Sequence, residues 1–169
     1  MWCGFQVLLI HKSYRVELDP NNRQRTHLAK HAGCARFAFN WGLEQRIQKY
    51  NTEEGKNRFT DFFEQSKELN RIKKTKFPWM YEVSKCATQE ALRNLDRTFK
   101  NFYRGLKKRQ HIGFPKFKKK GHHDSFRLNS RKQILGQDIQ LPRLGRLRMK
   151  EVLNITSMRS VWASLKPRS

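Results

Sequence analysis

The sequence has few cysteines, few acidic residues and no long hydrophobic run. Its 169 residues include three cysteines, 14 Asp or Glu and 37 Lys or Arg, and the formal net charge is +23. The cysteines are far apart and form no Cys-x-x-Cys pair, which excludes a zinc ribbon. The apolar run at residues 5–10 is too short to span a bilayer and lacks the basic start of a secretory signal. An odd number of cysteines without an export signal predicts a cytoplasmic protein.

The sequence also lacks the patterns of common catalytic sites. It has no Gly-rich phosphate loop. From residue 97 onward the acids are Asp124, Asp138 and Glu151, whose spacing does not indicate the converging carboxylates of a two-metal nuclease. His122 and His123 lie in a Lys-rich loop, where solvated or phosphate-facing side chains are commoner than metal ligands. We therefore predict no catalytic residue, no metal, no cofactor and no small-molecule substrate.

The positive charge is concentrated in the second part of the chain. Residues 1–96 carry a net charge of +6, and residues 97–169 carry +17. The densest part, 97–132, has 13 basic residues and a single acid, Asp124. Such repulsion destabilises a compact chain unless an anion relieves it, so the charge indicates a polyanion, with nucleic acid ahead of an acidic membrane. We predict a nucleic-acid partner and no membrane partner.

The first part of the chain predicts a strand and a long helix. Polar and apolar residues alternate over 12–18, as in a short strand, and Asp19 is a candidate helix N-cap followed by Pro20. An apolar stripe at helical spacing then runs to about residue 50; it comprises Leu28, Ala32, Ala35, Phe39, Leu43, Ile47 and Tyr50. Gly33 and Gly42 each weaken this helix by about 1 kcal/mol relative to Ala. Gly33 therefore leaves two interpretations open, one continuous helix or a helix-turn-helix.

Two further helices follow. One is predicted over 58–72, and another begins at an N-cap, Ser84, and ends at Gly105 as a candidate C-cap. One face of the last helix is apolar, and the other carries basic residues at steps of three and four, namely Arg93, Arg97, Lys100 and Arg104. A basic face on a packed helix is suited to following a phosphate backbone.

Strands are predicted again after the basic loop. They cover 125–128, 138–142 and 146–149, with a turn at Gly145 between the last two. Because strands flank the three helices on both sides, the simplest fold is α+β, a β unit with a helical insertion.

The segment 113–120 has the composition of a nucleic-acid contact. Phe114 and Phe117 alternate with four lysines, and Pro115 stiffens the backbone. Lysines neutralise phosphates, and the two rings could stack on bases or, as an equal alternative, anchor the loop to the core. The candidate phosphate contacts are Arg97, Lys100, Arg104, Lys107, Lys108, Arg109, Lys116, Lys118, Lys119, Lys120 and Arg127.

Five segments in this order resemble TnpB-type transposon-encoded proteins. They are YRVELDP at 14–20, GCARFAFNWGL at 33–43, ALRNLDRTFKNF at 91–102, GFPKFK at 113–118 and LPRLGRL at 141–147. Any one of them would be weak evidence, but five in order over roughly residues 11–149 make the resemblance specific.

The resemblance implies a fold and a function. TnpB-type proteins, long described as transposases, are RNA-guided DNA endonucleases of small insertion sequences. Their N-terminal half is a wedge-like β-barrel with an inserted helical recognition domain, which binds guide RNA and reads a short motif beside the DNA target. A ribonuclease-H-like domain with a zinc finger then cuts. For this chain, the resemblance implies a partial wedge-like β-barrel with an inserted three-helix recognition bundle, and guide RNA and double-stranded DNA as partners.

The resemblance also implies a division of the chain. Residues 1–19 would hold an N-terminal extension and the first barrel strand, 20–105 the helical recognition domain, 106–149 the basic loop and further strands, and 150–169 an irregular tail. We expect open strand edges at 125–149, and Val161 and Trp162 either cover one of them or stay unpacked.

The nuclease domain is expected to be absent, and the chain to be a truncated copy that binds nucleic acid without cutting it. The alternatives are an inert remnant of a mobile element and a non-cleaving regulator. A complete enzyme that hydrolyses nucleic acid alone is disfavoured by the missing carboxylate set.

Overall fold

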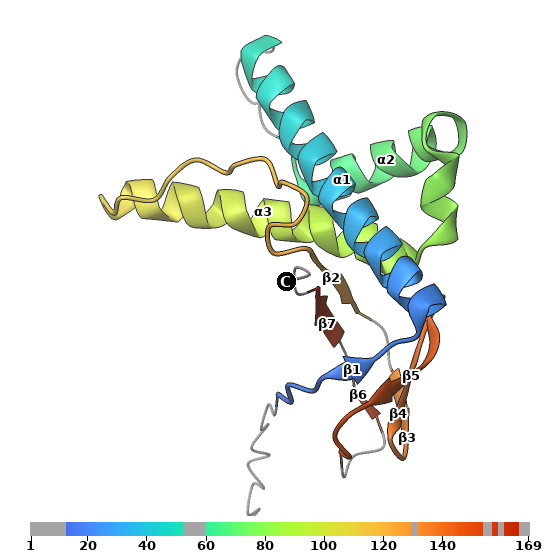
Figure 1. Ribbon diagram of the computed structural model, residues 1–169. Coiled ribbons are helices and arrows are strands. Elements are labelled where there is room, and N and C mark those ends of the chain that lie inside the picture. The colour runs from blue at the N-terminus through green and yellow to red at the C-terminus, as the bar shows by residue number, and fades with distance from the viewer. Residues whose placement is uncertain (1–12, 53–59, 130–131, 154–156, 159–160, 166–169) are drawn as a thin grey trace, which may run out of the picture.

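The protein is an α+β chain, as the sequence predicts (Figure 1). The computed structural model describes residues 13–52, 60–129, 132–153, 157–158 and 161–165. The helical elements are α1 (Asn22–Thr52), α2 (Phe62–Lys76), the 3₁₀ helix η2 (Pro78–Glu82) and α3 (Lys85–Lys107). The strands are β1 (Leu18–Asp19), β2 (Ser125–Leu128), β3 (Lys132–Leu135), β4 (Asp138–Leu141), β5 (Gly145–Met149), β6 (Ser157–Met158) and β7 (Val161–Ser164). None of the described helices is long and apolar enough to cross a membrane.

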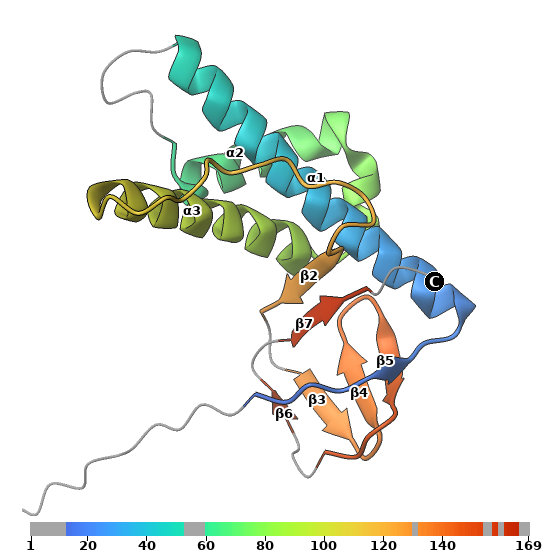
Figure 2. The ribbon, with the colours of Figure 1, turned by 60° about the vertical axis from the view of Figure 1, so that its left-hand side comes forward.

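The strands form two small antiparallel sheets below the helices (Figures 1 and 2). One has five strands in the order β1-β5-β4-β3-β6, and the other pairs β2 with β7. Within the described part of the chain these sheets do not close into a barrel. In the segment predicted as an irregular tail, the structure instead has β6 and β7. Val161 and Trp162 of β7 pair with Leu128 and Arg127, so β7 covers an edge of β2, the first of the two alternatives for these residues.

Two strand predictions need correction. Among residues 13–18, the described part of the strand expected over 12–18, only Leu18 lies in a strand, β1, where Leu18 and Asp19 pair with Met149 and Arg148 of β5. Glu17 adds one backbone hydrogen bond, from the Lys150 N–H at 2.8 Å; Lys12 lies outside the described residues. The turn expected at Gly145 comes earlier, over 142–144, because Leu141 and Gly145 already face each other as a pair. Strand β3, which pairs with β4 through Ile134 and Ile139, has no clear signal in the sequence.

Helix α1 begins later than predicted and continues through Gly33. Asn21 Oδ1 accepts a hydrogen bond from the Gln24 N–H at 2.9 Å, and Gln24 Oε1 accepts one from the Asn21 N–H at 3.0 Å. This reciprocal capping box satisfies two donors at the helix start, so the cap is Asn21, while Asp19 belongs to β1. Because α1 is uninterrupted from Asn22 to Thr52, the interpretation of a turn at Gly33 is wrong.

The ends of α2 and α3 also differ from the prediction. Helix α2 begins at Phe62, where Asp61 Oδ1 caps the Glu64 N–H at 2.9 Å, and it continues to Lys76. Ser84 caps α3 as predicted, but the C-cap of α3 is Lys108. Gly105 lies inside the last turns, where a Cβ would come within 2.3 Å of Ile112 Cδ1. This glycine therefore allows the following loop to pack against α3.

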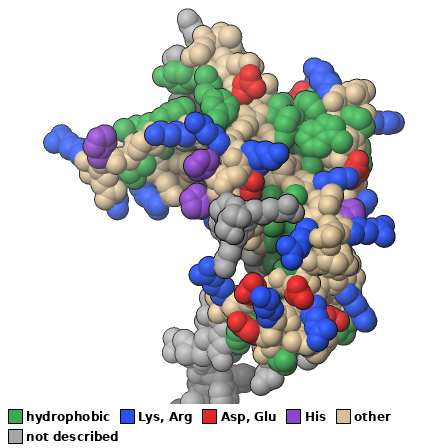
Figure 3. Space-filling view, in the orientation of Figure 1, with side chains coloured by type: hydrophobic (Ala, Val, Ile, Leu, Met, Phe, Trp, Pro, Cys, Tyr) green, Lys and Arg blue, Asp and Glu red, His purple; other side chains and the backbone are tan. Residues whose placement is uncertain are grey.

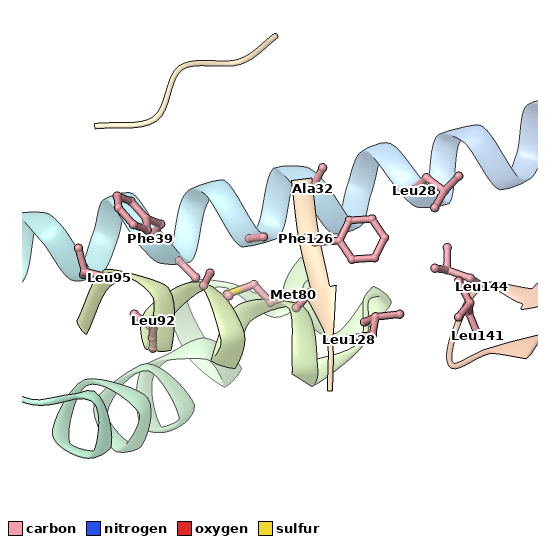
Figure 4. Packing of buried hydrophobic residues seen from close by; sticks show 14 of the residues in the cluster. Leu28, Ala32, Phe39, Met80, Leu92, Leu95, Phe126, Leu128, Leu141 and Leu144 are labelled. Carbon is pink, nitrogen blue, oxygen red and sulfur yellow. The ribbon is translucent and has the colours of Figure 1, made fainter. Parts of the chain in front are cut away.

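The core is centred where α1 crosses α3 (Figure 2). Leu43, Leu92 and Leu95 are fully buried there. The same cluster reaches the strands, because Phe126 and Leu128 of β2, together with Leu141 and Leu144 of the β4–β5 hairpin, extend it toward the start of α1 (Figure 4). One continuous apolar core thus fixes the sheets relative to the helices.

A buried polar network joins the three helices beside this core. Arg46 of α1 donates from Nε to Gln65 Oε1 of α2 at 2.8 Å and pairs through Nη2 with Asp96 Oδ1 of α3 at 3.2 Å. Gln65 in turn donates to the carbonyl oxygen of Gly42 at 2.7 Å. Burial opposes the ionisation of Asp96, but the hydrogen bonds from Lys100 and Arg46 outweigh it, so the pKa of Asp96 is lowered.

His31 is buried between α1 and the start of α3. Its Nδ1 lies 2.7 Å from the carbonyl oxygen of His27, which can only accept, so Nδ1 carries the proton. Its Nε2 therefore accepts the hydrogen bond from the Ser84 N–H at 3.0 Å. Burial lowers the pKa of His31; the bond to His27 opposes this, and the charges of His27 and Arg143 add to it.

We expect the free energy of unfolding to fall as the pH drops below about 6.5, the ordinary pKa of histidine. In that window the unfolded chain binds the His31 proton and the folded chain excludes it, so stability is present above the window and lost below it. Urea unfolding between about pH 7.5 and 5 should show this slope in the wild type and a flatter one in His31→Gln. The exposed His122→Gln is the control, and equal slopes in all three proteins would contradict the prediction.

Candidate nucleic-acid interface

The basic loop after α3 turns back and runs along α3 before it crosses α1 (Figures 1 and 2). Phe114 holds this course, because its ring packs edge to face on Phe99 at 5.6 Å and on Phe102 at 5.5 Å. Pro115 beside it is buried. Of the two interpretations of Phe114, its contacts fit the anchor, although 48% of the residue is still exposed.

Asn40 of α1 fixes the point where the loop crosses. Its Nδ2 donates to the Lys118 carbonyl oxygen at 2.9 Å, and its Oδ1 accepts from the Lys118 N–H at 2.8 Å. A side-chain amide thus pairs with the loop as a neighbouring strand would. Phe117 stays 52% exposed beside this clamp.

Lys118 itself is engaged by the protein. Its Nζ lies 4.5 Å from the centre of the Phe39 ring, a cation–π contact. Burial lowers the pKa of Lys118, and the nearby charge of Asp124 partly offsets this. The ammonium is therefore partly desolvated, although much of the residue's surface is exposed.

Asp124, the single acid of residues 97–132, is neutralised within the fold. It forms an ion pair with Arg36 of α1 and accepts the Gly121 N–H at 3.0 Å. Burial opposes its ionisation, but the Gly121 N–H and the Arg36 guanidinium outweigh that effect and lower the pKa of Asp124. This one carboxylate is shared between Arg36 and the neighbouring loop lysines, so most of the positive charge of the loop has no acidic partner within 97–132.

The candidate phosphate contacts fall into three places. Those on α3 and its end are exposed: Arg97, Lys100, Arg104, Lys107, Lys108 and Arg109. Lys100 pairs with Asp96 at 2.9 Å, and Arg104 donates to Asn101 at 2.7 Å. Lys116, Lys119 and Lys120 are exposed on the loop near Lys118.

Arg127 lies apart from the loop, on β2, where Glu90 Oε2 is 3.8 Å from its Nε. The structure therefore places the basic loop beside the α3 arm, with Arg127 on a different element. Figure 3 shows Lys and Arg side chains along the α3 arm and across the middle of that face.

Sequence reasoning missed the two α1 side chains that hold the loop, Arg36 and Asn40. The sequence feature that could have indicated Asn40 is its position as a polar residue between Phe39 and Trp41 on a helix. Its partner, the Lys118 backbone, is 78 residues away in the chain, so no local sequence pattern predicts this contact.

We expect Asn40→Ala to release the loop. The substitution removes both hydrogen bonds to Lys118 and should cost about 1–2 kcal/mol of stability. Amide hydrogen exchange at Lys118 should become faster, while exchange within β4, which is remote from the loop, stays unchanged. Gln48→Ala on the same helix is the control, and an unchanged exchange rate at Lys118 in Asn40→Ala would contradict the role of the clamp.

Among the described residues, no three His, Cys, Asp or Glu side chains come together in a group that could hold a metal ion.

Comparisons with known proteins find similarities to this basic α+β chain. Residues 10–56 match the helix-turn-helix domain of the IS605 OrfB family, a match that covers β1 and α1. A protein of Escherichia coli (strain K12) named "Putative RNA-guided DNA endonuclease InsQ" is 29% identical over 150 residues, 87% of this chain and 35% of that protein. A "Putative RNA-guided DNA endonuclease" of Streptomyces pristinaespiralis is 30% identical over 95 residues, 56% of this chain and 23% of that protein.

The resemblance seen in the sequence motifs is thereby confirmed, since the chain is similar both to the IS605 OrfB helix-turn-helix domain and to two proteins named as putative RNA-guided DNA endonucleases. The chain spans about a third of the length of InsQ. No nuclease domain is found among the matches to this chain; the matched domain is the helix-turn-helix domain. Within residues 13–52, the part of that match that the structure describes, the only helix is α1.

Proposed function

We propose that this chain is a nucleic-acid-binding lobe of a TnpB-type insertion-sequence protein, that it binds guide RNA, target DNA or both, and that it does not cut by itself. The observation that carries the proposal is the set of exposed basic side chains on α3 and on the loop that returns beside it. It includes ten of the 13 basic residues of 97–132, and the only acid of that segment is paired with Arg36.

The architecture supports such a role. The helix α3 gives the arm a rigid axis, and the Asn40 clamp and the Phe114 anchor hold the loop beside it. Lysines on a fixed backbone can meet successive phosphates with little loss of conformational entropy on binding. In this proposal the small sheets are part of a wedge-like barrel, the three helices are its inserted recognition bundle, and residues 20–105 are the recognition domain.

The first test is a titration of the protein against the candidate guide RNA of its own insertion sequence and against an unrelated structured RNA, each at low and high salt. Recognition predicts tight binding to the cognate RNA that survives added salt, because base and shape contacts are screened less than phosphate contacts. Equal binding to both RNAs that salt abolishes would reduce the function to that of a polycation.

A further inference from the structure

A groove of about 540 Å³ lies on the outer face of α1, between that helix and the basic loop. Its floor is a stripe of α1 residues at helical spacing, comprising Gly33, Arg36, Phe37, Asn40, Trp41 and Glu44. Phe77, which precedes η2, and Phe117 of the loop complete its lining. The volume falls in the range of small-ligand sites and leaves room for a nucleobase.

The aromatic side chains of the groove are held in place. The ring of Phe37 packs edge to face on Phe77 at 4.8 Å and on Trp79 at 5.0 Å. Phe117 follows Lys116 and precedes Lys118, whose backbone is clamped by Asn40. Flat apolar surfaces on fixed supports are what the stacking of a base requires, since every base presents a π-face.

Gly33 keeps the floor of the groove open. A Cβ at this position would meet only Arg36 Nη2, at 4.0 Å, so no packing contact requires a glycine. The continuous helix would gain up to about 1 kcal/mol from Ala here. The missing side chain therefore leaves this part of the groove floor open.

The charges in and around the groove indicate which part of a nucleic acid each would contact. Within the groove, Arg36 is neutralised by Asp124, and Glu44 is negative, so the groove itself offers little attraction to a phosphate. Lys116, Lys119 and Lys120, beside Phe117 in the chain, are exposed. We propose that the groove holds one unstacked base of a single-stranded nucleic acid, with the flanking phosphates on these lysines; this rests on the nucleic-acid binding proposed above.

The test uses substitutions that either fill the groove with a larger side chain or remove one of its walls. Gly33→Leu places a good helix former where the Cβ has room, and Ala29→Leu puts the same side chain one turn earlier on α1, outside the groove lining. Phe117→Ala removes the opposite wall at an exposed position. Each variant is first checked for wild-type thermal unfolding.

The probes are an unstructured single-stranded DNA of about 16 nucleotides carrying one 2-aminopurine, and a duplex of the same length without it. In the wild type, we expect quenching of 2-aminopurine fluorescence as it stacks. Gly33→Leu and Phe117→Ala should lose this quenching and bind the single strand about 5- to 100-fold more weakly, the range expected for one stacked base. Their affinity for the duplex, and all properties of Ala29→Leu, should stay at the wild-type level.

The outcomes separate this inference from the proposed function. A wild type that binds neither probe would contradict both. A wild type that binds both probes with a strong salt dependence, and single-strand binding that Gly33→Leu and Phe117→Ala leave unchanged, would overturn the base site alone. A concentration-dependent dimer that Gly33→Leu dissociates would assign the groove to a second copy of the chain and would likewise overturn it.

Discussion

Replacing Lys116, Lys119 and Lys120 together by glutamine should weaken the binding of double-stranded DNA and flatten its dependence on salt. All three side chains are exposed on the clamped loop. Each phosphate contact contributes about 0.9 to the slope of log affinity against log salt, so the slope should fall by about 2–3. Lys118 is left unchanged because its ammonium packs on Phe39. Replacing it would change both the stability of the fold and the affinity for DNA, and the two effects could not be separated.

The matched control removes the same charge from another surface. Lys67, Lys74 and Lys76 are exposed on α2, and their replacement by glutamine lowers the net charge equally. Fluorescence anisotropy with a labelled duplex at several salt concentrations gives both slopes. If the two triple variants lose the same affinity and the same slope, the net charge alone governs binding, and the interface assigned to the loop is wrong.

Alanine at the two glycines of α1 should have opposite effects on stability. At Gly33 a Cβ meets only Arg36 Nη2 at 4.0 Å, so Gly33→Ala should stabilise by up to about 1 kcal/mol. At Gly42 it would lie 2.7 Å from Leu92 Cδ2 and 2.9 Å from Leu95 Cδ2. Both leucines are fully buried and cannot turn away, so overpacking should cost about 1–3 kcal/mol.

Urea unfolding of the two variants and the wild type measures this contrast directly. The midpoints should lie on either side of the wild type, because the two substitutions share helix propensity and differ only in what the new methyl group meets. A stabilised Gly42→Ala would mean that α1 and α3 are not in close contact at this point. A destabilised Gly33→Ala would mean that the helix is not continuous there.

Much of the fold could be predicted from residue patterns of short range. The apolar stripe of α1, the cap at Ser84 and the strand at 125–128 are local signals, and each led to the observed element. The errors came where two local signals competed or where a partner lay elsewhere. Asp19 and Asn21 both resemble N-caps, and the reciprocal bonds with Gln24 favour Asn21.

The sequence predicted which residues make up the candidate interface, but it did not predict how they are arranged in space. The sequence shows that 97–132 is basic and that Phe114 and Phe117 interrupt the lysines. It could not distinguish the two rings, whereas the structure packs Phe114 on α3 and leaves Phe117 beside the groove. It also gave no sign that Arg36 would neutralise Asp124.

The sequence alone determined the charge, the helical stripes and the family resemblance, because these depend on the identity and order of residues. Only the tertiary structure decided what Gly33 and Gly42 are for and where the basic loop lies. The reason is physical: a glycine's role depends on what surrounds the missing side chain, and the loop is positioned by Asn40, 78 residues distant from Lys118 in the chain. Contacts of that range arise only when α1, α3 and the loop are packed together.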